Sequence, residues 1–177
     1  MRRYVGPAVL RSVLVAVLAL VATVARAQVD GSASEGSDRS AMEFDATLTG
    51  VQETPAIITT GSGSLKLTPH DDSISFVLTF SKLEAPATVS HIHVGQVGVA
   101  GGIAAFLCGG GGKPACPAEG GTVSGTITAE DVVGPTAQGI QPGQIDRLII
   151  AMRDGVAYVN VHSKLHPEGE IRGQIHP

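Results

Sequence analysis

The 177-residue sequence contains no tryptophan, two tyrosines and four phenylalanines, so large aromatic side chains contribute little to its core. Glycine, in contrast, is abundant, and 22 of the 23 glycines follow residue 27. A core of valine, isoleucine, leucine and alanine with frequent glycine turns is typical of a β-sheet protein and not of a helical bundle.

Positive charge is scarce beyond the N-terminal segment. All 16 acidic residues follow position 27, whereas four of the 12 basic residues precede it, so the net charge from Gln28 onward is −8. A surface of this charge repels phosphate groups. We therefore expect no nucleic-acid partner and no binding to an anionic membrane surface.

The N-terminal segment has no hydrophobic run long enough to cross a membrane. Its apolar run, residues 12–25, has 14 residues, whereas a spanning helix needs roughly 20. Arginines precede this run, and Ala25-Arg26-Ala27 follows it as a cleavage site. The pattern predicts a signal peptide over residues 1–27 and a protein that is periplasmic or secreted, without membrane attachment after cleavage. A retained membrane anchor is the alternative, which the short run disfavours.

Two further segments follow the predicted signal peptide. Residues 28–41 are small and polar and cannot bury a core, so they predict a flexible leader. Residues 42–177 then form a single domain of ordinary size.

Only two cysteines are present, Cys108 and Cys116, and no C-x-x-C redox motif occurs. An oxidising compartment outside the cytoplasm favours a disulfide between them. The alternative is a pair of free or metal-binding thiols.

Several catalytic signatures are missing. No serine lies in a G-x-S-x-G motif, and the glycines at 109–112 with Lys113 lack the order of a phosphate-binding loop. Asp71-Asp72 and Glu130-Asp131 have the contexts of a turn and a helix start. The sequence therefore gives no support for a hydrolase.

Short segments of alternating polarity, separated by turns, run through residues 42–177. The predicted strands lie near residues 44–49, 65–67, 73–80, 88–94, 103–107, 122–128, 157–162 and 170–175. The Pro69–Asp72 turn predicts an antiparallel hairpin between the second and third of these. Apolar residues spaced as in a helix predict one short helix near 143–153. The pattern indicates an all-β sandwich or barrel with that single helix.

Three histidines are candidates for metal ligands. His91 and His93 lie two residues apart in a predicted strand, so they share a face, which we expect to be exposed or to line a cleft. His162 lies on the polar face of a later strand with Tyr158 and Asn160. If the two strands are neighbours, three imidazoles meet, and imidazole suits copper or zinc. A polar hydrogen-bond network without metal is the alternative. His70, His166 and His176 receive no role.

The C-terminal hairpin supplies candidate neighbours for these ligands. Glu170 and Arg172 share a face on which they are expected to pair across strands. With Asn160, they form the predicted surroundings of the metal site. Since a ligating imidazole usually donates its second nitrogen to a carboxylate or carbonyl, Glu170 is also a candidate ligand or partner of His162.

Four motifs, in this order, resemble the CHRD domain, a module repeated in chordin and found singly in exported microbial proteins. They are Leu48-Thr49-Gly50-Val51-Gln52-Glu53-Thr54-Pro55, Thr60-Gly61-Ser62-Gly63, Ser90-His91-Ile92-His93-Val94-Gly95, and Tyr158-Val159-Asn160-Val161-His162 followed by Gly169-Glu170-Ile171-Arg172-Gly173-Gln174-Ile175.

The resemblance implies an all-β Greek-key fold, immunoglobulin-like or superoxide-dismutase-like, and implies no reaction. Chordin's antagonism of bone morphogenetic proteins does not carry over to a single exported domain. The H-x-H strand is also similar to the histidine strands of copper/zinc superoxide dismutases. However, the sequence has no equivalent of their zinc loop, so dismutation is not expected.

The leading hypothesis is an exported, non-enzymatic CHRD module that binds an extracytoplasmic protein or a metal ion. The second hypothesis is a copper-binding redox protein with a three-histidine site. The third is a purely structural surface domain, in which the histidines affect stability alone.

Overall fold

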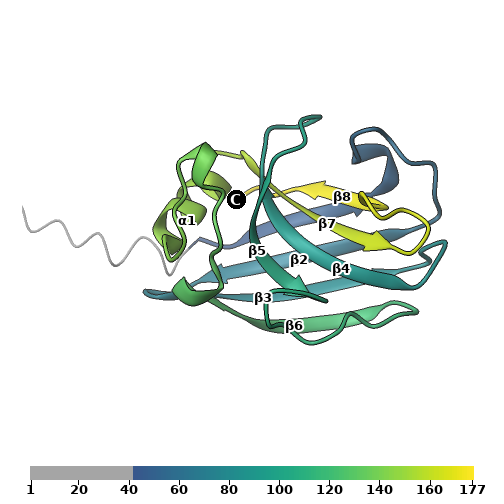
Figure 1. Cartoon of the computed structure of the whole chain (residues 1–177), viewed down its shortest axis with the longest axis horizontal. Helices are drawn as coiled ribbons and strands as arrows, with labels where there is room; N and C mark the ends of the chain where they lie inside the picture. Colours follow the sequence, from purple (N-terminus) through teal and green to yellow (C-terminus); the bar gives the residue numbers. More distant parts are fainter. Residues whose placement is uncertain (1–41) are drawn as a thin grey trace, which may run out of the picture. The chain divides into compact units, whose positions relative to one another are not determined.

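The computed structural model describes residues 42–177, and Figure 1 shows their arrangement. The predicted signal peptide (1–27) and leader (28–41) lie outside the described residues. Eight strands form the fold: β1 (Phe44–Thr49), β2 (Ser62–Pro69), β3 (Ser73–Ser81), β4 (Ala87–Val94), β5 (Gly102–Cys108), β6 (Gly121–Thr128), β7 (Ala157–Ser163) and β8 (Ile171–Gln174). One α-helix, α1 (Ile145–Arg153), and three single 3-10 turns, η1 (Gly50–Gln52), η2 (Ala129–Asp131) and η3 (Thr136–Gln138), complete it.

The eight strands form one antiparallel sheet in the order β5-β4-β7-β8-β1-β2-β3-β6. The sheet curls into a nearly closed barrel (Figure 1). β6 returns to lie beside β3, and β7 returns to lie beside β4, which are the long connections of a Greek key. The predicted all-β Greek-key class with one short helix is therefore confirmed.

Local sequence patterns account for the individual strands. In β1, Phe44, Ala46 and Leu48 are buried, whereas Asp45 and Thr47 are exposed, as a period of two requires. β2 and β3 pair in a continuous antiparallel register next to the predicted turn. The apolar sides of the strands fill the barrel interior.

The strands β4, β7 and β8 differ from this alternation. Every residue of β7 and β8 is buried, and so are residues 90–94 of β4. The polar face of these strands was expected to be exposed or to line a cleft, and this expectation was wrong. Residues 50–61, 95–101 and 164–170 carry the groups that contact this outer face.

The helix and the disulfide both lie where they were expected. α1 buries Leu148, Ile149 and Met152, and Gly155 after it adopts φ 67°, a conformation that favours glycine. Cys108, at the end of β5, forms a disulfide with Cys116. Within residues 42–177, no helix is long and apolar enough to cross a membrane.

Gly173 of β8 is predicted to be required for the close approach of β1. A Cβ at this position would lie 2.6 Å from the carbonyl oxygen of Thr47 and 3.2 Å from the Cβ of Ala46. We expect Gly173→Ala to lower the free energy of unfolding by about 1–3 kcal/mol, the usual cost of overpacking. Urea denaturation measures this change. Ser64→Ala, at an exposed position of β2, is the control, and equal effects of the two substitutions would show that the approach of β1 to β8 is not tight.

Candidate metal centre

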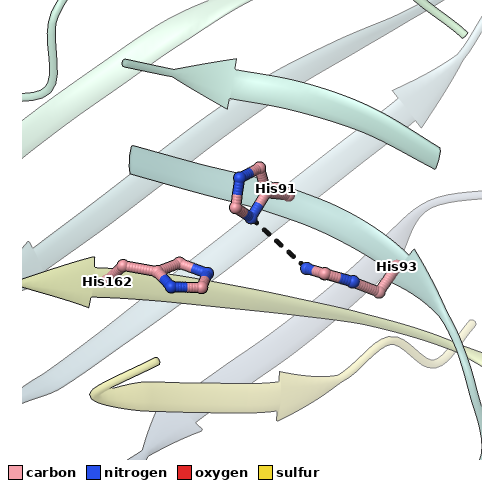
Figure 2. A group of neighbouring side chains, drawn as sticks. All are labelled: His91, His93 and His162. Carbon is pink, nitrogen blue, oxygen red and sulfur yellow. Dashed lines mark hydrogen bonds between the residues drawn. The ribbon is translucent and has the colours of Figure 1, made fainter. Parts of the chain in front are cut away.

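His91 and His93 of β4 and His162 of β7 converge on the covered outer face, and Figure 2 shows the three side chains. β4 and β7 are antiparallel neighbours, with His91 opposite Asn160 and His93 opposite Tyr158. The ring centroids of His91 and His93 are 5.1 Å apart, and those of His91 and His162 are 4.7 Å apart. One nitrogen of each ring lies within 4.8 Å of the other two. The structure thus brings together the three predicted ligands.

Hydrogen bonds to the backbone fix which nitrogen of two rings carries a proton. Nδ1 of His93 lies 3.0 Å from the carbonyl oxygen of Gly101, and Nδ1 of His162 lies 2.8 Å from that of Pro167. A carbonyl oxygen only accepts, so each Nδ1 must donate. In the neutral rings, both Nε2 atoms therefore carry lone pairs.

The Nε2 lone pairs of His93 and His162 have different surroundings. Nε2 of His93 lies 3.3 Å from Nδ1 of His91, the contact drawn as a dashed line in Figure 2. Nε2 of His162 is buried and has no hydrogen-bond partner. A buried nitrogen without a partner is costly unless another group reaches it.

All three imidazoles are held in the neutral form. Burial, followed by repulsion from His162 and His93, lowers the pKa of His91 from 6.5 to about 4. Burial also lowers the pKa of His93 and of His162. Because neutral imidazole is the form that binds metal, the environment favours ligation at neutral pH.

Arg172 and Tyr158 form the adjoining part of the face. The ring of Tyr158 stacks on His93, with centroids 4.8 Å apart and planes at 4°. The guanidinium carbon of Arg172 lies 3.4 Å from the centroid of the same ring, which is a cation–π contact. Arg172 belongs to β8, the neighbour of β7 on the side away from β4. Tyr158 therefore links the histidines to Arg172.

Arg172 also binds the segments that cover the site. Its guanidinium donates to the carbonyl oxygens of Val99 at 3.1 Å and Gln96 at 2.9 Å, and to Oγ1 of Thr54 at 3.4 Å. It is 2% exposed. The planar guanidinium group presents several N–H donors, so one side chain binds several acceptors at once. Arg172 thereby joins residues 95–101 to Thr54.

The predicted neighbours of the site divide into two groups. Asn160 lies opposite His91 in the register of β4 and β7 and opposite Arg172 in the register of β7 and β8, and its Oδ1 is buried without a hydrogen-bond partner. Glu170 has other partners: its Oε1 accepts from Thr59 and from the backbone of Glu84. Neither Glu170 nor Arg172 takes part in a cross-strand ion pair among the described residues, because the side chain of each bonds to a loop.

Sequence reasoning assigned no role to Glu53, which the structure places beside this cluster. Glu53 is 8% exposed, accepts a hydrogen bond from the backbone amide of Thr54 at 3.4 Å, and interacts electrostatically with Arg172. Burial raises the pKa of its carboxyl group. The one available signal was its position in the Gln52-Glu53-Thr54-Pro55 motif, which carries no periodicity.

This arrangement supplies three neutral nitrogen donors on two hydrogen-bonded strands. Such a set matches the ligand preference of zinc and copper. The bonds from Nδ1 of His93 and His162 to carbonyl oxygens are the outer contacts that usually orient metal-bound imidazoles.

Comparison with known proteins gives one family. The model described as the CHRD domain matches residues 44–175. No curated protein and no solved structure matches the chain.

The three depressed histidine pKa values predict acid-sensitive stability of the metal-free protein. A histidine that is neutral when folded contributes stability above its unfolded pKa near 6.5, and this is lost as the pH falls toward the folded value, about 4 for His91. We expect His91 alone to contribute a loss on the order of 3 kcal/mol across that window. Urea denaturation at pH 7.5, 5.5 and 4.5 measures the slope.

The slope should be reduced in His91→Gln and kept in His70→Gln, which removes an exposed histidine. Parallel pH curves for the wild type and His91→Gln would contradict a neutral buried His91.

Arg172→Lys is predicted to loosen the cover of the site. A lysine cannot hold the separate carbonyl oxygens of Gln96 and Val99 as the guanidinium fork does. The oxygen of Gln96 keeps its bond from the amide of Val99, whereas the oxygen of Val99 loses its side-chain donor, so we expect a cost of about 1–3 kcal/mol. Hydrogen exchange of residues 95–101 should accelerate, and the free energy of unfolding should fall. The matched control is Arg147→Lys on the exposed side of α1, which we expect to be neutral. Unchanged exchange in Arg172→Lys would refute the role of Arg172.

Proposed function

The chain belongs to the CHRD domain family, and from this premise we propose that it is an exported, non-enzymatic module that binds a copper or zinc ion through His91, His93 and His162. Asn160 and Arg172 surround these ligands in the proposed site.

The observation that carries the proposal is the unpartnered Nε2 of His162. Its ring is anchored through Nδ1 to Pro167, so the free lone pair lies within the cluster of donor nitrogens and not toward water. His93 is anchored in the same way to Gly101. A metal ion would use both lone pairs, whereas a purely structural network leaves the His162 nitrogen unsatisfied.

The charge of the site favours copper over zinc. The donor atoms are imidazole nitrogens, so the ligand set itself carries no negative charge, and the Arg172 guanidinium is near. The carboxylates that interact with this region, Glu168 with His162 and Glu53 with Arg172, are not in the ligand set. Burying an uncompensated charge is costly, and the cost grows with the charge. Monovalent copper therefore fits this neutral, buried set better than a divalent ion.

Burial supports binding in preference to turnover. The three histidines are between 5% and 8% exposed. The covering segments are bonded to the face through Gly101 and Pro167, which accept from the histidines, and through Arg172. A redox enzyme needs an open coordination position that its substrate reaches. The covered face disfavours that second hypothesis.

Export is supported by the disulfide and by the sequence. A bond between Cys108 and Cys116 is typical of an oxidising compartment. The signal-like segment 1–27 predicts the same destination, periplasmic or secreted.

Elemental mass spectrometry on untagged protein, purified from its export compartment, tests the proposal. We expect near-stoichiometric copper or zinc in the wild type, and almost none when His91, His93 and His162 are all replaced by alanine. His162→Gln, which alters one side chain, guards against misfolding of the triple variant and should also lose the metal. His70→Gln is the matched control and should keep it.

Negligible metal in the wild type, with no uptake at micromolar metal, would end the proposal. Equal metal in the wild type and in correctly folded His162→Gln would also contradict it.

A further inference from the structure

A second cluster of metal-ligating side chains lies away from the three histidines. It contains Glu84, from the connection between β3 and β4, and His166 and Glu170, from the connection between β7 and β8. One ligand atom of each residue lies within 4.8 Å of the other two. We propose that these residues form a separate site for a divalent cation of the zinc type.

Glu170 is the buried part of this site. Its side chain has no exposed surface, and its Oε1 accepts from Thr59 Oγ1 at 2.7 Å and from the Glu84 amide at 2.7 Å. Its Oε2 is buried and has no hydrogen-bond partner. A carboxylate oxygen in that position calls for a donor or a cation, since burying it unpaired is costly.

Glu84 and His166 form the outer part. Nε2 of His166 lies 2.9 Å from Oε2 of Glu84, and the two side chains are 20% and 37% exposed, for His166 and Glu84 respectively. That hydrogen bond satisfies one atom of each residue but leaves Oε2 of Glu170 without a partner. Partial exposure gives an ion access from solvent and leaves room for water to complete its coordination.

One backbone hydrogen bond joins the two connections, and two further bonds attach the second connection to β7. The amide of Lys164 donates to the carbonyl oxygen of Pro86 at 3.0 Å, and the amide of His166 donates to Oγ of Ser163 at 3.2 Å. The amide of Glu170 donates to the carbonyl oxygen of Val161 at 2.9 Å. The ligands are therefore held on fixed backbone before any ion binds, which lowers the entropy lost on binding.

The ligand set indicates the kind of ion. One imidazole and two carboxylates are common ligands of zinc, and the two negative charges balance a dication. In this respect the cluster is the opposite of the three-histidine group, which is neutral. The same chain thus offers an anionic site for a divalent ion and a neutral site that suits monovalent copper.

Isothermal titration of the metal-free, disulfide-intact full chain with Zn²⁺ tests the second site. We expect Glu84→Gln and His166→Gln each to bind one equivalent fewer than the wild type. Both replaced residues are partly exposed, so the fold should tolerate the changes. His70→Gln is the exposed-histidine control and should match the wild type.

His162→Gln separates this site from the one in the proposed function. It should keep the equivalent of Zn²⁺ that Glu84→Gln loses, whether or not the three-histidine group binds zinc. Zn²⁺ should raise the melting temperature of His162→Gln through the remaining site. Zinc stoichiometry that is unchanged in both Glu84→Gln and His166→Gln, or no zinc bound by the wild type, would overturn the inference.

Discussion

The guanidinium of Arg172 holds the outer face of β4, β7 and β8 closed. It is a buried charge, which proteins tolerate only with several partners. Two backbone carbonyl oxygens, a threonine hydroxyl and the face of Tyr158 supply them. Without these bonds, residues 95–101 would have no charged anchor on the face, and the carbonyl oxygen of Gly101 that orients His93 belongs to that segment.

Closure of this face changes the chemistry of every polar group beneath it. Imidazoles that would titrate near neutral pH stay neutral, whereas the carboxyl group of Glu53 has a raised pKa. Both shifts have burial as their main cause, because a low dielectric disfavours the charged form of each group. Arg172 alone must remain charged there, since its proton is not lost in proteins. The cover therefore sets the protonation of the site as well as its access.

The sequence predicted the strands, the helix and the disulfide, because these depended on local periodicity or on a single cysteine pair. It placed His91 and His93 on one face of a strand, but their meeting with His162 depended on the pairing of β4 with β7, which periodicity does not reveal. The sequence did not predict that the outer face of β4, β7 and β8 is buried. The covering segments have no periodic pattern, and their position follows from contacts between residues far apart in the chain. For the same reason the sequence did not indicate that Glu53 lies beside the histidines. It also did not indicate the position of Glu170, which would share the face of Arg172 in an extended strand. The turn before β8 and the bonds from Thr59 and Glu84 direct Glu170 elsewhere.

The Greek-key connections also separate the residues of the site along the sequence. β5, β6 and α1 lie between β4 and β7 in the sequence, so the pairing that brings the three histidines together is a non-local contact. The bonds from Arg172 of β8 to Gln96 and Val99 in the cover are equally non-local. An ion bound by the proposed three-histidine site would therefore have to enter before these contacts form, or after residues 95–101 separate from the face. Access to the proposed site would then be controlled by the opening of this cover and not by diffusion of an ion to the protein surface.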